Sequence, residues 1–343
     1  MRAMRRARTA GAAILFASGS ALIALVSPAG AQTATPIVMK LSTATLNDTQ
    51  HEWMKRFAAA VESDSGGRIK GEIYPASQLG AIPRQIEGTQ FGSIQGWIGP
   101  PEFLVGVDER YEVLSAPGLF ASRDQDVRVL HDPVVNNLIL GLGGNKGLIG
   151  GGIWPLGPSS LITKKAIHSL GDYKGLKIRV LASPFQLEMI KRIEASPIAM
   201  TLADVLPALQ QGAIDGSLTT ITQYTTLHYI DVAKYVVEIG QPFVNTIAVF
   251  SKRWVEGLPP DLQKIVRDDA TKVSTEIVPF VNEFFDAQRK VWKDSGGDLS
   301  TLAAADQEAM MARISSVAGD LSVSKPELKA AVKIVFEAAA RNK

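Results

Sequence analysis

Residues 175–216 read GLKIRVLASPFQLEMIKRIEASPIAMTLADVLPALQQGAIDG, and this stretch decides the fold class. Short apolar runs at 176–180 and 198–200 are typical of strands, whereas apolar residues recur at helical spacing over 184–193 and 203–211. Strands that alternate with helices in this way favour a sheet with helices packed on its faces. We therefore predict an α/β fold.

The segment before this stretch carries the same alternation. Strands are predicted at 37–43, 69–74 and 94–98. Helices are predicted to start near Asp48, which suits an N-cap, and at Pro83, which suits a first helical turn. This segment predicts an α/β lobe with a largely parallel sheet, and the stretch quoted above belongs to a second such lobe.

One short pattern occurs in both predicted lobes. Residues 90–96 (QFGSIQG) and 210–216 (QQGAIDG) share Q-x-G-x-I-[QD]-G. In each case a helix is predicted to end at the first glycine and a strand to start two residues later. An echo of seven residues is weak evidence of duplication, because helix-glycine-strand units recur in many α/β proteins.

The remaining predicted elements complete the two lobes. A helical pattern runs from about 261 to 293, and at 1.5 Å per residue its roughly 33 residues span about 50 Å. We expect this helix to lie across both lobes, with a kink at Pro279. Further strands are predicted at 148–154, 161–163, 236–239 and 246–251, and further helices at 123–140 with a break near 132–133, at 304–318 and at 326–341.

The first 31 residues have the pattern of a secretory signal peptide. Four arginines precede an apolar run at 11–26, and Ala29-Gly30-Ala31 resembles a cleavage site. Its removal would lower the 36 basic residues to 32 against 34 acidic ones, a net charge of −2. We expect a soluble periplasmic protein that does not bind nucleic acid.

The composition offers little support for catalysis. Cysteine is absent, the four histidines lie in unrelated segments, and the glycine-rich run at 141–152 fits neither a dinucleotide nor a phosphate loop. No nucleophile motif of the G-x-S-x-G type occurs. We therefore predict no enzyme activity, no metal site and no cofactor.

Arg179 stands out because it is a charged residue at the end of a strand that reads as buried. A buried guanidinium needs an anionic partner, either an internal carboxylate or a bound ligand, and the residue type alone leaves both open. Trp97 and Trp154, at other strand ends, could line an apolar pocket or pack in the core. His51, at the mouth of the first helix, could face a ligand or the surface.

Five stretches together are similar to one known family, the periplasmic solute-binding proteins of tripartite ATP-independent periplasmic (TRAP) transporters, of the dicarboxylate-binding type. They are SGGRIKGEIYPASQLG at 65–80, LFASRDQDVRVLHDP at 119–133, LGDYKGLKIRVLASP at 170–184, TLADVLPALQQGAIDG at 201–216 and SKRWVEGLPPDLQKIV at 251–266.

This resemblance implies a two-lobe periplasmic-binding-protein fold with a long helix bridging both lobes. It implies that the chain binds a small organic carboxylate between the lobes through Arg179 and delivers it to a membrane permease of the TRAP type. We expect the chain to be a monomer. We expect one lobe at 36–156 plus about 243–285, and the other at 157–242 plus about 286–343.

Two departures from the family pattern bear on the ligand. Ser159 lies near the position where many members carry a second arginine, and Thr219 stands where they often carry asparagine. We therefore predict a monocarboxylate with a hydroxyl, oxo or apolar tail. The alternatives are a periplasmic enzyme acting on a small organic acid, or a binding protein for an ATP-driven importer or a sensor.

Overall fold

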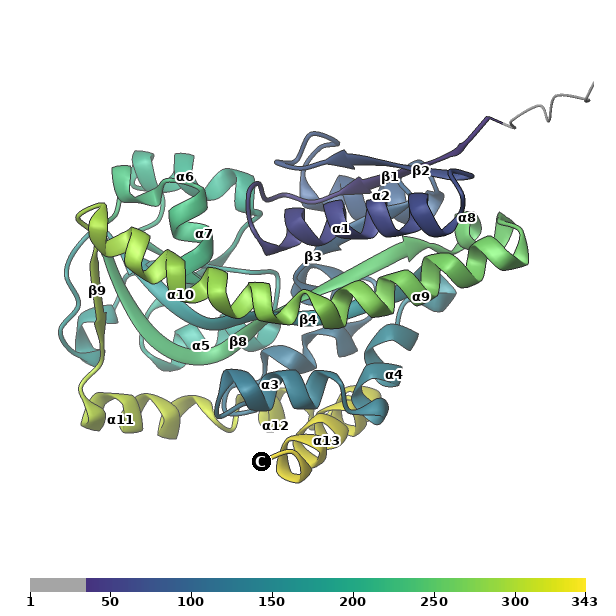
Figure 1. Ribbon diagram of the computed structural model, residues 1–343. Helices are drawn as coiled ribbons and strands as arrows, with labels where there is room; N and C mark the ends of the chain where they lie inside the picture. Colours follow the sequence, from purple (N-terminus) through teal and green to yellow (C-terminus); the bar gives the residue numbers. More distant parts are fainter. Residues whose placement is uncertain (1–34) are drawn as a thin grey trace, which may run out of the picture. The chain divides into compact units, whose positions relative to one another are not determined.

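The computed structural model describes residues 35–343, so the predicted signal peptide at 1–31 lies outside the described residues. One mixed sheet of nine strands forms the centre of the described chain (Figure 1). Its order is β2-β1-β3-β8-β4-β7-β5-β6, and β9 also pairs with β8. The strands are β1 (Ile37–Ser42), β2 (Ile69–Tyr74), β3 (Gly96–Gly99), β4 (Leu148–Thr163), β5 (Lys177–Val180), β6 (Ser196–Ala199), β7 (Gly216–Thr219), β8 (Tyr235–Ser251) and β9 (Asp298–Thr301).

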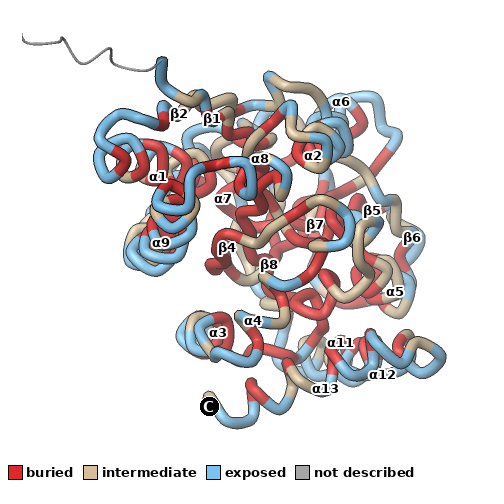
Figure 2. The backbone as a smooth tube through the Cα atoms, turned by 90° about the vertical axis from the view of Figure 1, so that its right-hand side faces the viewer, coloured by how far each residue is buried: buried red, intermediate tan, exposed pale blue. Residues whose placement is uncertain are grey.

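Helices connect these strands and cover the sheet, and Figure 2 shows the central strands β4, β7 and β8 largely buried among helices that are partly exposed. Within residues 35–343, no helix is both long and apolar enough to cross a membrane. The α-helices are α1 (Thr49–Asp64), α2 (Ile82–Phe91), α3 (Arg123–Leu130), α4 (Pro133–Gly141), α5 (Pro184–Arg192), α6 (Leu202–Gln211), α7 (Ile221–Thr226), α8 (Lys252–Gly257), α9 (Pro260–Glu276), α10 (Val278–Asp294), α11 (Ala304–Ile314), α12 (Val317–Ser322) and α13 (Pro326–Arg341). The 3-10 helices are η1 (Pro101–Leu104), η2 (Glu109–Ser115), η3 (Gly144–Lys146), η4 (Leu170–Tyr173) and η5 (Tyr229–Asp231).

The sheet consists of two parallel halves joined by two antiparallel strands. In the first half-sheet β1 pairs in parallel with β2 and β3, and in the second half-sheet β5 pairs in parallel with β6 and β7. Between them β4 and β8 pair antiparallel with each other, and each pairs antiparallel with its neighbouring half-sheet. The parallel pairing predicted for a lobe is therefore found within each half-sheet, and the antiparallel pairing of β4 and β8 joins the two halves.

The two central strands are longer than predicted. The separate strands predicted at 148–154 and 161–163 are one strand of 16 residues, and those at 236–239 and 246–251 are one of 17. Glycines and prolines in the intervening segments indicated breaks, because both residues are unfavourable in strand interiors. The β4–β8 ladder instead absorbs them through register shifts, at Gly150/Gly152, Pro155/Gly157 and Pro158/Ser160.

The long helical stretch runs across both half-sheets, as predicted. α9 packs against α1 and β4, and α10 packs against α7 and β9. Figure 1 shows the two helices following one another across the molecule. They meet at Ile277, whose backbone stays right-handed helical, with φ −77° and ψ −20°. The kink thus lies two residues before Pro279, because proline removes a helical hydrogen bond and crowds the preceding turn.

The repeated Q-x-G-x-I-[QD]-G pattern folds in the same way in both half-sheets. Gly92 ends α2 in the left-handed conformation at φ 85°, and Gly212 ends α6 in the same way at φ 72°. This conformation is open to glycine without steric cost, which explains the glycine at both places.

The residue before the last glycine of each pattern makes equivalent hydrogen bonds to a neighbouring strand. The Gln95 backbone N–H donates to the Lys40 carbonyl at 3.0 Å, and its side-chain Oε1 accepts from the Lys40 N–H at 3.0 Å. Asp215 makes the same pair with Lys177, at 2.8 Å and 2.9 Å. The two half-sheets are therefore locally equivalent, with Lys40 corresponding to Lys177.

Candidate functional site

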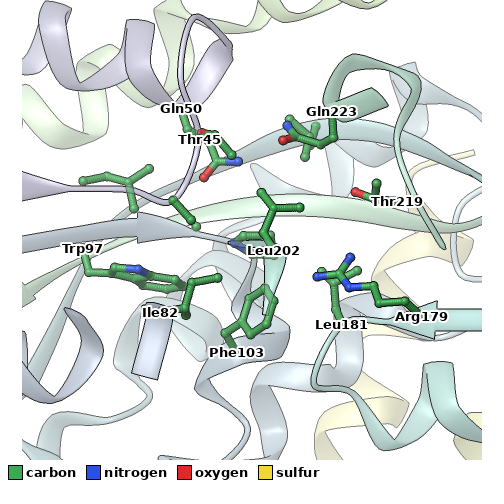
Figure 3. Close-up of a pocket in the computed structure, with 15 residues that line it drawn as sticks. Thr45, Gln50, Ile82, Trp97, Phe103, Arg179, Leu181, Leu202, Thr219 and Gln223 are labelled. Atoms are coloured by element: carbon green, nitrogen blue, oxygen red, sulfur yellow. The ribbon is translucent and has the colours of Figure 1, made fainter. Parts of the chain in front are cut away.

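A pocket lies between the carboxyl ends of the first and second half-sheets (Figure 3). This is where ligands sit in open α/β sheets. Most of its walls are apolar, and the polar lining side chains are few. The lining residues are Ala44, Thr45, Gln50, Ile82, Trp97, Ile98, Gly99, Pro100, Phe103, Leu156, Arg179, Leu181, Leu202, Thr219 and Gln223.

The space inside this pocket is small. Its volume is about 20 Å³, whereas one water molecule needs roughly 10–15 Å³ measured in the same way. In Figure 3, Leu202 of α6 lies in the middle of the pocket, between Trp97 on one side and Arg179 on the other. The space between these side chains is therefore large enough for a water molecule and too small for an organic acid.

Arg179 lies in this pocket, near the carboxyl end of β5, and its side chain is 1% exposed. Its Nε donates to the Met200 carbonyl at 3.0 Å, and its Nη1 donates to the Leu218 carbonyl at 3.3 Å. Within residues 35–343, no carboxylate lies within 4.0 Å of its guanidinium. Neutral carbonyls orient the fork of this cation but do not neutralise its charge.

The electrostatics of Arg179 follow from this burial. Desolvation lowers the pKa of the guanidinium, and the nearby Tyr229, Tyr224 and Glu102 act in the opposite direction. An arginine nevertheless keeps its proton at neutral pH. The pocket therefore holds one buried positive charge with no direct ion-pair partner in the described chain.

Because the two half-sheets are locally equivalent, the residues that face the pocket can be compared position by position. With Lys40 matched to Lys177, Ser42 corresponds to Arg179, and Gly99 corresponds to Thr219. A side chain on Gly99 would collide with Trp97, because its Cβ would lie 2.4 Å from the indole Cζ2. One wall thus presents an indole and the other a guanidinium with a hydroxyl.

Three of the residues predicted from the sequence meet in this pocket, namely Arg179, Thr219 and Trp97. The backbone N–H of Thr219 donates to the Tyr224 hydroxyl at 3.0 Å, which fixes the end of β7. Trp97 is fully buried, and its indole N–H has no hydrogen-bond partner among the described residues. A buried donor of this kind is costly unless it finds an acceptor.

Three polar residues of the pocket were not predicted: Thr45, Gln50 and Gln223. In Figure 3 they lie on the side of the pocket opposite Ile82 and Phe103. Asp48 places Gln50, because its Oδ1 caps α1 by accepting from the Gln50 N–H at 3.1 Å. These residues are uncharged and match no motif. The only signal in the sequence for a place in the pocket is that they follow the carboxyl ends of β1 and β7.

The other three predicted residues lie outside the pocket. His51 follows Gln50 on α1, and the turn of about 100° per residue directs it away, where its Nδ1 accepts from the Asn47 N–H at 3.2 Å. Trp154 is fully buried and stacks on Trp53 at 4.9 Å.

Ser159 also leaves the pocket. It lies at the register shift between Pro158 and Ser160 and lines a separate groove that also includes Arg123 and Glu238.

Comparison with known proteins agrees with this architecture. The model of the family described as "Bacterial extracellular solute-binding protein, family 7" matches residues 41–322. The protein YiiZ of Salmonella typhimurium is 33% identical over 217 residues, which cover 63% of this chain and 66% of that one.

Two solved structures share the fold. One is a TRAP periplasmic solute-binding protein from Desulfovibrio salexigens with bound orotic acid, which has a TM-score of 0.84, 24% identity, and coverage of 89% of this chain and 99% of that one. The other is the sugar acid binding protein DctPAm of Advenella mimigardefordensis with galactonate, with a TM-score of 0.85, 20% identity, and coverage of 90% and 99%. The predicted family is therefore confirmed, and the chain belongs to the family 7 extracellular solute-binding proteins, with their two-lobe fold.

Proposed function

We propose that this chain is the solute-binding subunit of a TRAP transporter, which takes up a small organic carboxylate in the pocket around Arg179 and delivers it to a membrane permease from the periplasm. Membership of a family of extracellular solute-binding proteins supports the general role. Beyond this role, we propose that the solute is a carboxylate anion, that Arg179 anchors it and that a TRAP permease receives it.

The observation that carries the proposal is the isolated charge of Arg179. Its guanidinium is buried, lines the pocket and has no carboxylate within 4.0 Å in the described chain. A buried cation is stabilised by an anion held in its fork, and a planar carboxylate matches that fork with two parallel hydrogen bonds. A ligand carboxylate supplies this partner.

The remaining lining supports a monocarboxylate. Among the described residues that line the pocket, only Arg179 is charged, and the other polar groups are the hydroxyls of Thr45 and Thr219, the amides of Gln50 and Gln223 and the Trp97 indole N–H. These groups suit hydroxyl or oxo substituents, whereas a second carboxylate would remain without a cation. The ligands named for the two structural neighbours, orotic acid and galactonate, each carry one carboxylate.

The binding motion we propose is a hinge closure between two lobes, 36–156 plus about 243–285 and 157–242 plus about 286–343. The pocket is lined from both of these lobes, which supports the assignment. Only β4 and β8 of the sheet run from one lobe to the other. A ligand that touches both lobes favours the closed arrangement through these contacts alone.

A thermal-shift measurement with orotate, D-galactonate and succinate tests this function. The two monocarboxylates are expected to raise the melting temperature of the wild type more than succinate, because they bind the folded state. Arg179→Gln should lose this response. The control Arg253→Gln, at an exposed arginine outside the pocket, should retain it. An equal response of Arg179→Gln and wild type would contradict the proposal.

Two further outcomes separate the alternatives. An enzyme would convert the acid, so recovery of orotate and D-galactonate unchanged after incubation with the protein supports binding alone. A TRAP permease is encoded by adjacent genes for a small and a large membrane subunit, and genes for an ATPase or a sensor kinase in their place would contradict the proposed partner.

A further inference from the structure

The side-chain oxygen of Gln223 is a buried hydrogen-bond acceptor that no group of the described chain satisfies. Gln223 lies on α7, which follows β7, and it lines the pocket on the same side as Gln50 and Thr45 (Figure 3). It is 2% exposed, and its Oε1 has no hydrogen-bond partner within residues 35–343. An acceptor buried in this way is unfavourable, because it has lost its bonds to water. This oxygen therefore needs a hydrogen-bond donor when the pocket is closed.

Asp48 fixes the orientation of the Gln223 amide. The Gln223 Nε2 donates to Asp48 Oδ2 at 3.1 Å. The other Asp48 oxygen accepts from the backbone N–H groups of Gln50 and His51, at 3.1 Å and 3.0 Å. Turning the Gln223 amide over would place its oxygen against a carboxylate oxygen, and two acceptors cannot bond to each other. The amide atom without a partner is therefore an oxygen, which accepts and cannot donate.

The other polar side chains that line the pocket are donors or can turn to donate. The Trp97 indole N–H donates only, and it has no partner among the described residues. The Gln50 Oε1 already accepts from the Thr43 hydroxyl at 3.0 Å, so the Gln50 amide nitrogen is the end left for other bonds. The two lining threonines carry hydroxyls, which rotate to donate or accept. Among the described lining side chains, the Gln223 oxygen is therefore the only fixed acceptor without a donor.

The solute groups that satisfy this oxygen are those that carry a donor hydrogen. A hydroxyl donates to such an oxygen and can also accept from a donor such as the Trp97 N–H, whereas an oxo group only accepts and an apolar group does neither. An ammonium group would donate as well, but it would bring a second positive charge into a pocket whose only charged side chain among the described lining residues is Arg179.

We propose that the solute is a hydroxy carboxylate, and that Gln223 selects it against the corresponding oxo acid by accepting a hydrogen bond from its hydroxyl. This inference rests on the proposed function for the carboxylate at Arg179. The Trp97 N–H can donate to a hydroxyl or to an oxo oxygen, so it adds affinity for both acids. Gln223 alone distinguishes them, because an oxo acid leaves the Gln223 oxygen without a donor.

The size of this discrimination follows from the cost of the unpaired oxygen. While the lobes are apart, water can bond to the Gln223 oxygen whichever acid is present. Once they close, the oxygen is cut off from water and only the solute can supply the donor. We expect the oxo acid to bind more weakly by roughly tenfold to a hundredfold.

Matched pairs of acids test this selection by calorimetric titration. The pairs are lactate with pyruvate, and β-hydroxybutyrate with acetoacetate, whose members differ only by a hydroxyl in place of an oxo group. Wild type should prefer the hydroxy acid in at least one pair by the factor given above. Gln223→Leu should lose this preference, and Gln90→Leu, the same change at a glutamine outside the pocket, should keep it.

Trp97→Phe separates the acceptor from the donor. It should weaken both members of the preferred pair by similar factors and leave their ratio at the wild-type value. Ratios within a pair are informative even where a variant alters lobe closure or stability, because both acids bind to the same protein and such effects cancel.

The outcomes distinguish this inference from the proposed function. Equal affinities within both pairs, or binding of neither pair, overturn the inference, and so does a wild-type preference retained in Gln223→Leu. The proposed function stands in each of these cases if Arg179→Gln abolishes the binding of whichever acids bind, D-galactonate included. If wild type binds none of the four acids and no D-galactonate, the proposed function fails as well.

Discussion

The Gln223 amide nitrogen donates to the Asp48 carboxylate at 3.1 Å, and this bond joins α7 to the first turn of α1 above the pocket. Both side chains are 2% exposed. Asp48 also caps α1 through its other oxygen. The bond therefore links the helix that carries Gln50 to the helix that carries Gln223, and in the proposed hinge motion it would favour the closed arrangement of the pocket.

Gln223→Ala should shift the ligand-free protein towards an open arrangement. A hydrogen bond to a charged group contributes about 1.5–3 kcal/mol, which corresponds to a change of roughly tenfold to a hundredfold in the closed-to-open ratio. Small-angle X-ray scattering should show a larger radius of gyration. Gln90→Ala, at a glutamine far from the pocket, is the control and should match wild type. Equal radii for Gln223→Ala and wild type would show that this bond does not hold the lobes together.

Gly152→Ala should destabilise the fold at the contact between β4 and α9. A Cβ at this position would lie 2.0 Å from the Ser274 hydroxyl and 3.0 Å from the Ala270 carbonyl. Ser274 cannot easily turn away, since its hydroxyl accepts from the Trp53 indole and donates to Ala270. Overpacking of this kind costs about 1–3 kcal/mol.

Urea denaturation measures this cost. Gly106→Ala is the matched control, because a Cβ there meets nothing within 4 Å. Similar unfolding free energies for the two variants would mean that α9 moves aside without loss of stability.

The stability of the protein should decrease as pH rises from about 4.5 to about 7. Glu102 and Glu112 each have a pKa raised from 4.5 to about 7, mainly by burial. In this window the folded protein binds more protons than the unfolded chain, so each carboxyl lowers the unfolding free energy by up to about 1.4 kcal/mol per pH unit. Above pH 7 this contribution is lost and the profile is flat with respect to these groups.

Urea midpoints at pH 5, 6, 7 and 8 test this pH dependence. The slope between pH 5 and 7 should be smaller in Glu112→Gln than in wild type, because glutamine does not titrate. A variant with the wild-type slope would show that Glu112 ionises at its ordinary pKa in the folded protein.

The elements of the fold were largely predictable from local patterns. Residues 69–74 form a strand with the predicted bounds, and the helix after Asp48 starts where its cap predicts. The continuity of β4 and β8 was not predictable, because it depends on partners more than 70 residues away. Gly157 and Pro158 disfavour a strand locally, and the ladder of two long strands overrides that preference.

The sequence identifies those site residues whose side chains are costly to bury in an apolar segment. Arg179 was identifiable because a guanidinium in an apolar strand needs a partner. Gln50 and Gln223 carry no such cost, so their sequence context gives no comparable signal. Nothing in the sequence distinguishes Trp154 from Trp97. In the structure, Trp154 stacks on Trp53 in the core, whereas Trp97 lines the pocket.

The central claim is that Arg179 holds the ligand carboxylate, and a two-by-two comparison of affinities tests it most directly. D-galactonate and its primary amide are titrated into wild type and Arg179→Gln. Loss of the buried charge partner should weaken D-galactonate by about 2–5 kcal/mol and affect the uncharged amide far less. If Arg179→Gln weakens the acid and the amide equally, or neither, the carboxylate does not lie on Arg179 and the account is contradicted.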